Sequence, residues 1–161
     1  MSRSSLTSHS IQIATTATEF GVGRALFEEY AAQLGVDLCF QGFAAELDRL
    51  PEHYGAPSGA LMLAWNGATA AGCVAVRKLE ATTCELKRLY VRDDRRGSGL
   101  GRALSLAVLD QARALGYTDV VLDTLVTMPA AQALYESLGF TDTVAYYTNP
   151  LAGARYLRRV L

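Results

Sequence analysis

The chain has 161 residues, which is the size of one ordinary domain, and half of these residues are hydrophobic. This apolar content is enough for a sizeable core and excludes wholesale disorder, while no apolar run reaches the roughly 20 residues of a membrane-spanning helix. A formal net charge of −1 excludes a globally basic nucleic-acid-binding protein, and the three cysteines, none in a CxxC pair, argue against a disulfide scaffold or a zinc ribbon. We expect a soluble, cytoplasmic α/β protein.

The N-terminal part of the chain predicts a flexible tail, residues 1–10, followed by one domain, residues 11–161. A short strand is expected at residues 11–15, because apolar residues alternate there. Apolar residues then recur at intervals of three and four, which predicts a helix from Thr18 that ends at Gly35. A second helix is predicted at residues 40–50, ended by Pro51, and residues 53–59 are predicted to form a loop.

The middle of the chain predicts three strands. Residues 60–65 and 69–79 flank Asn66-Gly67, which is a strong signal for a two-residue hairpin turn. The third strand, residues 84–91, has apolar residues at 84 and 86 and then at 89 and 91, so the alternation slips by one residue at Lys87-Arg88. Such a slip predicts a β-bulge, in which two residues oppose one residue of the neighbouring strand.

The last part of the chain predicts two helices and three further strands. An apolar stripe predicts a helix at residues 99–115, capped by Gly116, and a nearly continuous apolar run predicts a buried strand at residues 120–126. Pro129 begins another helix that closes at Gly139, and strands are expected at residues 143–147 and 154–160. This order of elements predicts one mixed sheet with helices on both faces.

The segment between the third strand and the long helix carries the most specific chemical signal. It reads Arg96-Gly97-Ser98-Gly99-Leu100-Gly101-Arg102, with three alternate glycines directly before the helix. Glycines let the backbone approach a ligand closely, and a helix N-terminus offers unpaired N–H groups and about half a positive charge. Together with the nearby charges of Arg95, Arg96 and Arg102, these features predict a site for a pyrophosphate group.

Three other interpretations of this segment exist. A P-loop needs Lys and then Ser or Thr after its last glycine, whereas Gly101 is followed by Arg102 and Ala103. A Rossmann fingerprint needs a strand that runs directly into the first glycine and a wider spacing to the third, and neither condition holds here. A glycine-rich surface turn without a ligand is the third interpretation, and the sequence alone leaves it open.

The same segment resembles the acetyl-CoA loop of the GNAT (N-acetyltransferase) superfamily, which reads Arg/Gln-x-x-Gly-x-Gly/Ala. Every fixed position of that loop is matched, by Arg96, Gly99 and Gly101. A second signature of the superfamily, Ala-x-x-Leu-Tyr-x-x-x-Gly-Phe, is matched by Ala131, Leu134, Tyr135, Gly139 and Phe140. The resemblance covers most of the chain from residue 11 onward. It implies an α/β (α+β) fold with a single mixed, mostly antiparallel sheet and helices on both faces.

The resemblance also implies which residues bind the cosubstrate acetyl-CoA. The pyrophosphate of coenzyme A would be bound by Arg96 and by backbone N–H groups around Gly97, Ser98, Gly99, Gly101 and Arg102. The pantetheine arm would lie in a gap between the strands at residues 84–91 and 120–126, where it would pair with the backbone of Leu89 and Val91. Members often carry Asn at the start of the tyrosine helix, where this chain has Met128, so one side-chain contact to the cofactor differs.

Two residues are candidates for acid and base. Because an alkylamine has a pKa of about 10.4, some group must accept its proton at neutral pH. Tyr135 would lie near the thioester sulfur and donate to the departing thiolate; its alternative role is that of a core aromatic residue. Glu85 stands where some family members hold a catalytic glutamate and is the candidate base. The alternatives are an ordered water chain and a solvent-facing Glu85 that pairs with Lys87 or Arg88.

The resemblance implies an acetyl-CoA-dependent N-acetyltransferase that acts on a small amine or an exposed peptide amino group, as a monomer or a homodimer. It implies no metal, nucleic acid or membrane partner. Other functions are a non-catalytic acyl-CoA-binding or sensing module and, more distantly, a nucleotide-dependent oxidoreductase. Two segments have two interpretations each. His53 and Tyr54 either line the acceptor pocket or belong to a plain surface loop, and residues 146–150 either close the acceptor side or form a strand that ends in a turn. Cys73 and Cys84 are expected to be small buried hydrophobic residues.

Overall fold

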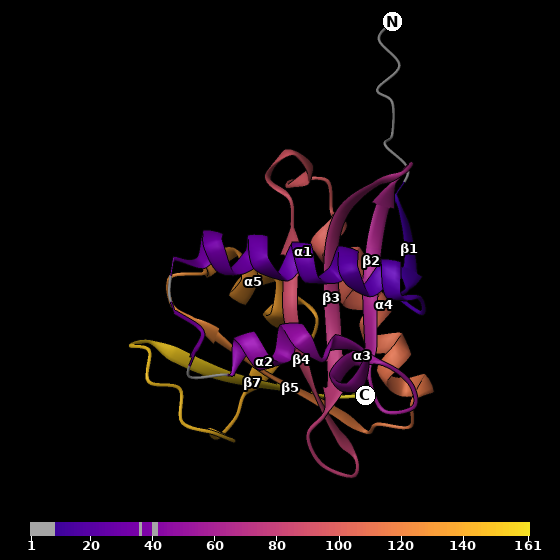
Figure 1. The fold of residues 1–161 in the computed structure, drawn as a ribbon. Helices are drawn as coiled ribbons and strands as arrows, with labels where there is room; N and C mark the ends of the chain where they lie inside the picture. Colours follow the sequence, from indigo (N-terminus) through magenta and orange to yellow (C-terminus); the bar gives the residue numbers. More distant parts are fainter. Residues whose placement is uncertain (1–8, 36, 40–41) are drawn as a thin grey trace, which may run out of the picture.

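The computed structural model describes residues 9–35, 37–39 and 42–161, in which seven strands form one sheet with helices on both faces (Figure 1). The strand order is β1-β2-β3-β4-β5-β7-β6; β4 and β5 are parallel and the other neighbours are antiparallel. The strands are β1 (Ser10–Ile13), β2 (Ala60–Asn66), β3 (Thr69–Lys78), β4 (Thr83–Val91), β5 (Asp119–Leu125), β6 (Thr141–Asp142) and β7 (Ala154–Val160). The helices are α1 (Ala17–Leu34), α2 (Phe43–Asp48), α3 (Leu50–Tyr54), α4 (Leu100–Ala114) and α5 (Pro129–Ser137), with a 3-10 turn at Asp93–Arg95. The predicted mixed sheet is confirmed.

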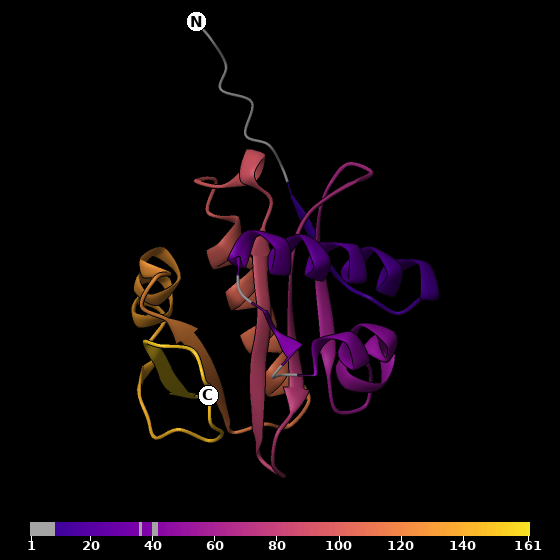
Figure 2. The same ribbon diagram turned by 60° about the vertical axis from the view of Figure 1, so that its left-hand side comes forward.

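The helices divide between the two faces of the sheet (Figure 2). Helices α1, α2 and α3 cover one face, where Leu26, Phe27 and Tyr54 pack on Leu61 and Cys73. Helices α4 and α5 cover the other face, in a second cluster that includes Leu104, Val108, Tyr135, Val74 and Cys84. The two clusters form because successive strand residues point to opposite faces.

Helix α1 ends before Gly35 as predicted, but it begins at Ala17, one residue before the predicted Thr18, after an N-cap that the prediction did not name. The Thr16 hydroxyl accepts a hydrogen bond from the Glu19 N–H at 3.2 Å, and the Glu19 carboxylate accepts from the Thr16 N–H at 3.0 Å. This reciprocal pair satisfies two of the N–H groups that a helix start leaves unpaired. Gly35 follows the helix with φ 69, the left-handed conformation that glycine adopts without strain.

The predicted β-bulge in β4 is confirmed. Cys73 of β3 pairs with Tyr90 and Ala75 pairs with Lys87, so Arg88 and Leu89 together stand opposite Val74. Arg88 has φ 62, which is uncommon for any residue but glycine. The extra residue keeps the apolar residues before and after it on the same face of the sheet.

Several predicted boundaries are wrong. The predicted helix at residues 40–50, of which residues 40–41 lie outside the described part, corresponds to two short helices. Pro51 stands in the first turn of α3 rather than ending a helix, because the first turn needs no N–H from that residue. His53 and Tyr54 therefore belong to α3 and not to a loop, and the fully buried Tyr54 packs edge-on against Phe27 with ring centroids 5.7 Å apart.

The two ends of the domain also differ from the sequence prediction. Strand β1 begins at Ser10, which the prediction assigned to the tail, and residues 1–8 of that tail lie outside the described part of the chain. The predicted strand at residues 143–147 is wrong, because β6 is only Thr141–Asp142 and the following residues form no strand. There, the side chains of Tyr146 and Tyr147 turn to carboxylates on β4 and β5 instead of continuing the alternation of a strand.

Candidate functional site

Strands β4 and β5 separate after only three paired positions. Thr83 pairs with Asp119, Cys84 with Val120, and Glu85 with Val121, after which the register of the two strands ends. Strand β5 continues to pair with β7 along all seven of its residues, from Asp119 to Leu125. The bulge at Arg88 bends β4 away at this point, so the middle of the sheet contains a gap whose edges are polar backbone groups.

The bulge is held by a buried ion pair. The Nε and Nη2 atoms of Arg88 each donate to the Glu46 carboxylate of α2 at 3.0 Å, and both side chains are buried. Burial alone would raise the pKa of Glu46, but the hydrogen bonds and charge of Arg88 outweigh it and hold the pKa below its usual range. The pair therefore stays charged and fixes an unusual backbone conformation at the gap.

The backbone of Leu89 and Val91 faces this gap. The Arg92 N–H donates to the Ala71 carbonyl of β3 at 2.9 Å, and Tyr90 pairs with β3 as well. Because backbone polar groups of alternate strand residues point to opposite sides, those of Leu89 and Val91 point toward β5. The Val91 carbonyl already accepts from Arg96 Nε at 3.1 Å, which leaves its N–H and both groups of Leu89 along the gap.

The glycine-rich segment leads from β4 into α4 with an uncapped helix start. Gly97 and Gly99 have φ 78 and 82, and no atom outside the adjacent residues lies within 4 Å of where a Cβ would stand on either glycine. Gly99 is the residue before α4, and no side chain caps the first N–H groups of the helix. Ser98 does not cap them, because its hydroxyl donates to the Arg95 carbonyl at 2.6 Å. Free N–H groups and the helix dipole make this start suitable for an anion.

A groove of about 560 Å³, here called the outer groove, connects this helix start to the gap. Five of the predicted cofactor residues line it: Leu89, Val91, Arg96, Gly101 and Met128. The others, Gly97, Ser98, Gly99 and Arg102, belong to the adjoining loop and helix start. Arg96 is fixed there by Gln33 of α1, whose Oε1 accepts from Nη2 at 2.6 Å, and by Asp93 at 2.8 Å. Arg102 instead donates to the Ser137 hydroxyl of α5 at 3.0 Å.

A smaller space of about 60 Å³, here called the inner cavity, lies between the same strands. Tyr30, Leu34, Leu89, Met128 and Ala131 line both spaces, which are therefore adjacent. The inner cavity adds Tyr135, Arg88, Asp123 and Asn149 to its lining. Tyr135 is only 6% exposed, and burial raises the pKa of its hydroxyl well above the usual value. The hydroxyl therefore stays protonated at neutral pH.

The structure does not bring Glu85 into the lining of either space. Glu85 is only 1% exposed, in contrast to the solvent-facing alternative, and both of its carboxylate oxygens have partners. Its Oε1 binds Arg77 Nε at 2.9 Å and lies 4.0 Å from Lys87 Nζ, and its Oε2 accepts from the Tyr146 hydroxyl at 2.5 Å. Burial and the charge of Arg88 lower the pKa of Lys87 to about 8.

The family of the chain follows from comparison with known proteins. The model of the acetyltransferase (GNAT) family matches residues 23–140, which include both the glycine-rich loop and the Tyr135 helix. The chain belongs to the GNAT acetyltransferase family. This confirms the resemblance that the two sequence motifs indicate, and it makes the chain an N-acetyltransferase by family. Within the part of the chain that the structure describes, no helix combines the length and apolar character needed to cross a bilayer.

Other GNAT proteins resemble the chain along most of its length. An uncharacterized N-acetyltransferase of Schizosaccharomyces pombe is 42% identical over 135 residues, which are 83% of each chain. An acetyltransferase structure from Streptococcus agalactiae has a TM-score of 0.78 at 21% identity and covers 95% of this chain and 98% of its own. A Bacillus subtilis acetyltransferase solved in complex with CoA has a TM-score of 0.67 at 20% identity, covering 96% of this chain and 99% of its own. The predicted GNAT-like fold is confirmed.

Sequence reasoning missed two polar residues near the gap between β4 and β5, Glu46 and Asp123, whereas Asn149 lies within the segment 146–150 that it considered for the acceptor pocket. Glu46, which holds the bulge, comes from a predicted helix without a distinguishing motif. Asp123 lies on β5 beside the inner cavity, and Asn149 reaches it from the segment between β6 and β7. The available signal was Asp123 itself, since a carboxylate interrupts an otherwise apolar run there. A charge inside a buried strand needs a partner or a function.

Proposed function

We propose that this acetyltransferase transfers the acetyl group of acetyl-CoA to a small amine or an exposed amino group by direct attack of the amine on the thioester. The observation that carries the proposal is the continuity of three features. An uncapped α4 start adjoins the outer groove, the groove runs along the unpaired edge of β4, and it meets the inner cavity lined by Tyr135. This path has the order that pyrophosphate, pantetheine and thioester have in the cofactor. The Bacillus subtilis relative in complex with CoA supports the same ligand.

The residues present fit a coenzyme A pyrophosphate. Side chains at Gly97 and Gly99 would fill the space that the backbone N–H groups face, and both positions lack them. Arg96 places a guanidinium at the rim of the groove, where its ion pair with Asp93 is exposed to solvent and can rearrange toward a phosphate. We assign pyrophosphate binding to the backbone of Gly97, Ser98, Gly99, Gly101 and Arg102 together with the Arg96 side chain. Met128 at the start of α5 contributes an apolar contact where relatives often have asparagine.

The thioester supplies an acyl carbon that is already activated, so the protein has to align the amine, exclude water and move protons. Tyr135 is assigned as the acid, because its buried hydroxyl keeps its proton and lines the inner cavity. It donates that proton to the thiolate as the carbon–sulfur bond breaks. Leu89 and Val91 align the pantetheine arm of the cofactor through their backbone groups on the edge of β4.

Glu85 is assigned as the base that receives the proton of the amine. Because Arg77 and Tyr146 cover its carboxylate, the proton reaches it through the Tyr146 hydroxyl, which donates to Oε2. The partly exposed Arg77 and the buried Lys87 place two cationic groups beside this carboxylate. Residues 11–161, with Ser10 at the first strand, form the domain that we assign to this activity.

A thiol-release assay with acetyl-CoA tests the proposal across alkylamines, amino acids, polyamines and peptides, combined with calorimetry of coenzyme A binding. We expect coenzyme A to bind and at least one amine to accelerate thiol release above the hydrolytic background. Binding of coenzyme A without turnover for any amine would instead support the non-catalytic acyl-CoA-binding module. Absence of binding at millimolar coenzyme A would contradict both functions.

A further inference from the structure

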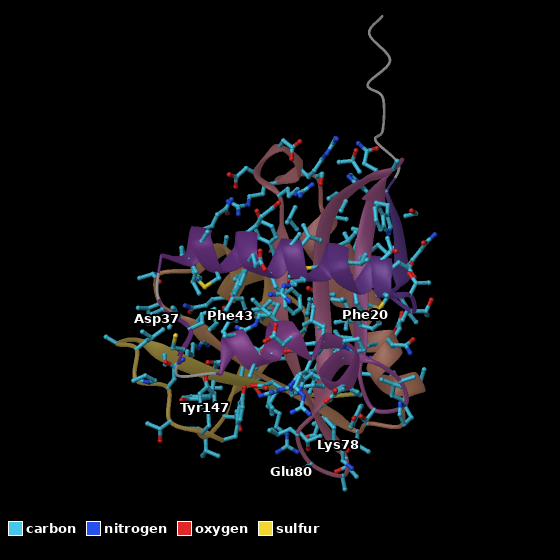
Figure 3. All side chains as sticks on the ribbon, in the orientation of Figure 1. Phe20, Asp37, Phe43, Lys78, Glu80 and Tyr147 are labelled. Carbon is cyan, nitrogen blue, oxygen red and sulfur yellow. The ribbon has the colours of Figure 1, made fainter. Side chains whose placement is uncertain are left out.

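The carboxylate of Asp123 lines the inner cavity and forms no ion pair within the part of the chain that the structure describes. Its Oδ2 accepts hydrogen bonds from the Tyr147 hydroxyl and from Asn149 Nδ2, the latter at 2.9 Å, and both donors are neutral. Tyr147, labelled in Figure 3, comes from the segment between β6 and β7. No lysine, arginine or histidine among residues 9–35, 37–39 and 42–161 forms an ion pair with Asp123. A carboxylate therefore lies in the lining of the inner cavity together with Tyr135.

The only other charged residue in the lining of this cavity is Arg88, among the residues that the structure describes. Its guanidinium already binds Glu46 through two hydrogen bonds of 3.0 Å, so Glu46 neutralises its charge. The ring of Phe43 also lies below it, with the guanidinium carbon 5.1 Å from the ring centroid. The cavity therefore presents one uncompensated negative charge. A negative charge in a low-dielectric cavity favours the binding of a cation and opposes the binding of an anion.

The rest of the lining is mainly apolar. It consists of Leu34, Leu38, Leu89, Leu125, Met128, Ala131 and Leu151, together with the rings of Tyr30 and Tyr135 and the side chain of Thr124. Such walls bind a hydrocarbon stem and offer no positive group to a carboxylate. The free space of about 60 Å³ admits only a small head group at this depth. The lining of the inner cavity thus combines the Asp123 carboxylate with mainly apolar walls.

The Asp123 carboxylate is fixed before any ligand arrives. Asn149 accepts a hydrogen bond from the Leu151 N–H at 2.9 Å through Oδ1, and its own N–H donates to the Tyr156 hydroxyl at 3.0 Å. These bonds hold the amide that in turn donates to Asp123. Both donors bind Oδ2, and no described residue donates a hydrogen bond to Oδ1, so this second oxygen can accept one from a ligand. Fixed groups lose little freedom on binding, which favours affinity.

We infer that Asp123 binds the ammonium group of the acyl acceptor, and that the acceptor is a primary amine on an apolar stem with no carboxylate next to the amine. This inference rests on the proposed function, since it names the acceptor class of the same site. An α-amino acid would bring its carboxylate close to Asp123 without meeting a free cation. The corresponding amine without the carboxylate avoids that repulsion.

The pair 3-methylbutylamine and leucine tests this inference, because the two molecules differ only by the carboxylate. Their binding is measured by calorimetry to wild-type protein, to Asp123→Asn and to the control Asp110→Asn, each with and without saturating coenzyme A. Asp110 is an exposed residue of α4 paired with Arg113, so its substitution makes the same charge change elsewhere. We expect wild type to bind the amine at least about tenfold more tightly than leucine. We expect Asp123→Asn to lose about tenfold or more of that affinity, and Asp110→Asn to lose none.

The Asp123→Asn variant keeps an oxygen that accepts from Tyr147 and Asn149, so the fold is expected to persist. Asn149→Ala gives a second measurement, because it leaves the Asp123 carboxylate in place and removes one of the two hydrogen bonds that orient it. We expect this variant to lose less amine affinity than Asp123→Asn. Equal amine affinity in wild type, Asp123→Asn and Asn149→Ala would overturn the inference. Leucine binding to wild type as tightly as the amine would also overturn it. Failure of wild type to bind coenzyme A is a separate outcome, which overturns the proposed function and with it the acceptor assignment.

Discussion

Gly99 and Gly116 stand at the two ends of helix α4 with the same left-handed backbone conformation. Their φ angles are 82 and 94, and in both cases no atom outside the adjacent residues lies within 4 Å of the position that a Cβ atom would take. A side chain at either position therefore strains the backbone similarly and meets no steric obstacle from the protein. Only Gly99 lies at the uncapped start of the helix beside the outer groove.

This relationship predicts different consequences for Gly99→Val and Gly116→Val. Both variants are expected to lose roughly 1–2 kcal/mol of unfolding free energy, because a branched residue is strained at positive φ. Only Gly99→Val is expected to weaken coenzyme A binding, since its side chain occupies the space that the pyrophosphate needs. Thermal unfolding and calorimetry measure the two effects. Equal coenzyme A affinity in the two variants would place the phosphate site elsewhere.

Removal of the Tyr135 hydroxyl is expected to slow turnover more than it weakens cofactor binding. Burial raises the pKa of Tyr135 above its usual value, so the hydroxyl carries a proton at neutral pH. General acid catalysis contributes about 10²–10⁴-fold, and Tyr135→Phe is expected to lower kcat by an amount in this range. The ring remains to pack on Phe140, whose centroid lies 5.6 Å away. A parallel loss of kcat and coenzyme A affinity would make Tyr135 a binding residue only.

The base assignment is tested by breaking the same ion pair from its two sides. Glu85→Gln removes the carboxylate, whereas Arg77→Gln removes its partner at 2.9 Å and leaves the carboxylate in place. If Glu85 accepts the proton, Glu85→Gln is expected to lower kcat by about 10²-fold or more. Arg77→Gln is expected to lower kcat much less, because the carboxylate that accepts the proton remains. Similar losses in both variants would indicate that the ion pair only supports the fold.

Lys87 makes the stability of the protein depend on pH in the alkaline range. Burial and the charge of Arg88 lower its pKa from 10.5 to about 8. Between these two values the unfolded chain binds more protons than the folded chain, so the free energy of unfolding rises with pH. We expect a contribution of roughly 1–3 kcal/mol between pH 8 and 10, measured by urea unfolding. The same series on Lys87→Met is expected to lack this rise; an identical pH profile would contradict the assignment.

The features that the sequence predicts correctly are those that depend on neighbouring residues. The slip at Lys87-Arg88 predicts the β4 bulge, because side chains alternate along any strand regardless of what the strand packs on. Gly35 and Gly99 mark helix ends, because positive φ is a local property of the backbone. The failures lie where tertiary contacts override local preference. Tyr146 and Tyr147 are aromatic residues of the kind that favours strands, yet both lie outside any strand and donate hydrogen bonds to carboxylates.

The amino-acid sequence by itself determined the family, the glycine-rich loop before α4 and the tyrosine helix, since each is a contiguous motif with its own backbone geometry. Only the tertiary structure decided that Glu46 binds Arg88, that Arg77 pairs with Glu85, and that Asp123 lines the inner cavity with no ion-pair partner among the described residues. The reason is physical. The burial, charge environment and proton affinity of a side chain depend on which distant segments of the chain contact it. The periodicity of the sequence does not show which segments come into contact.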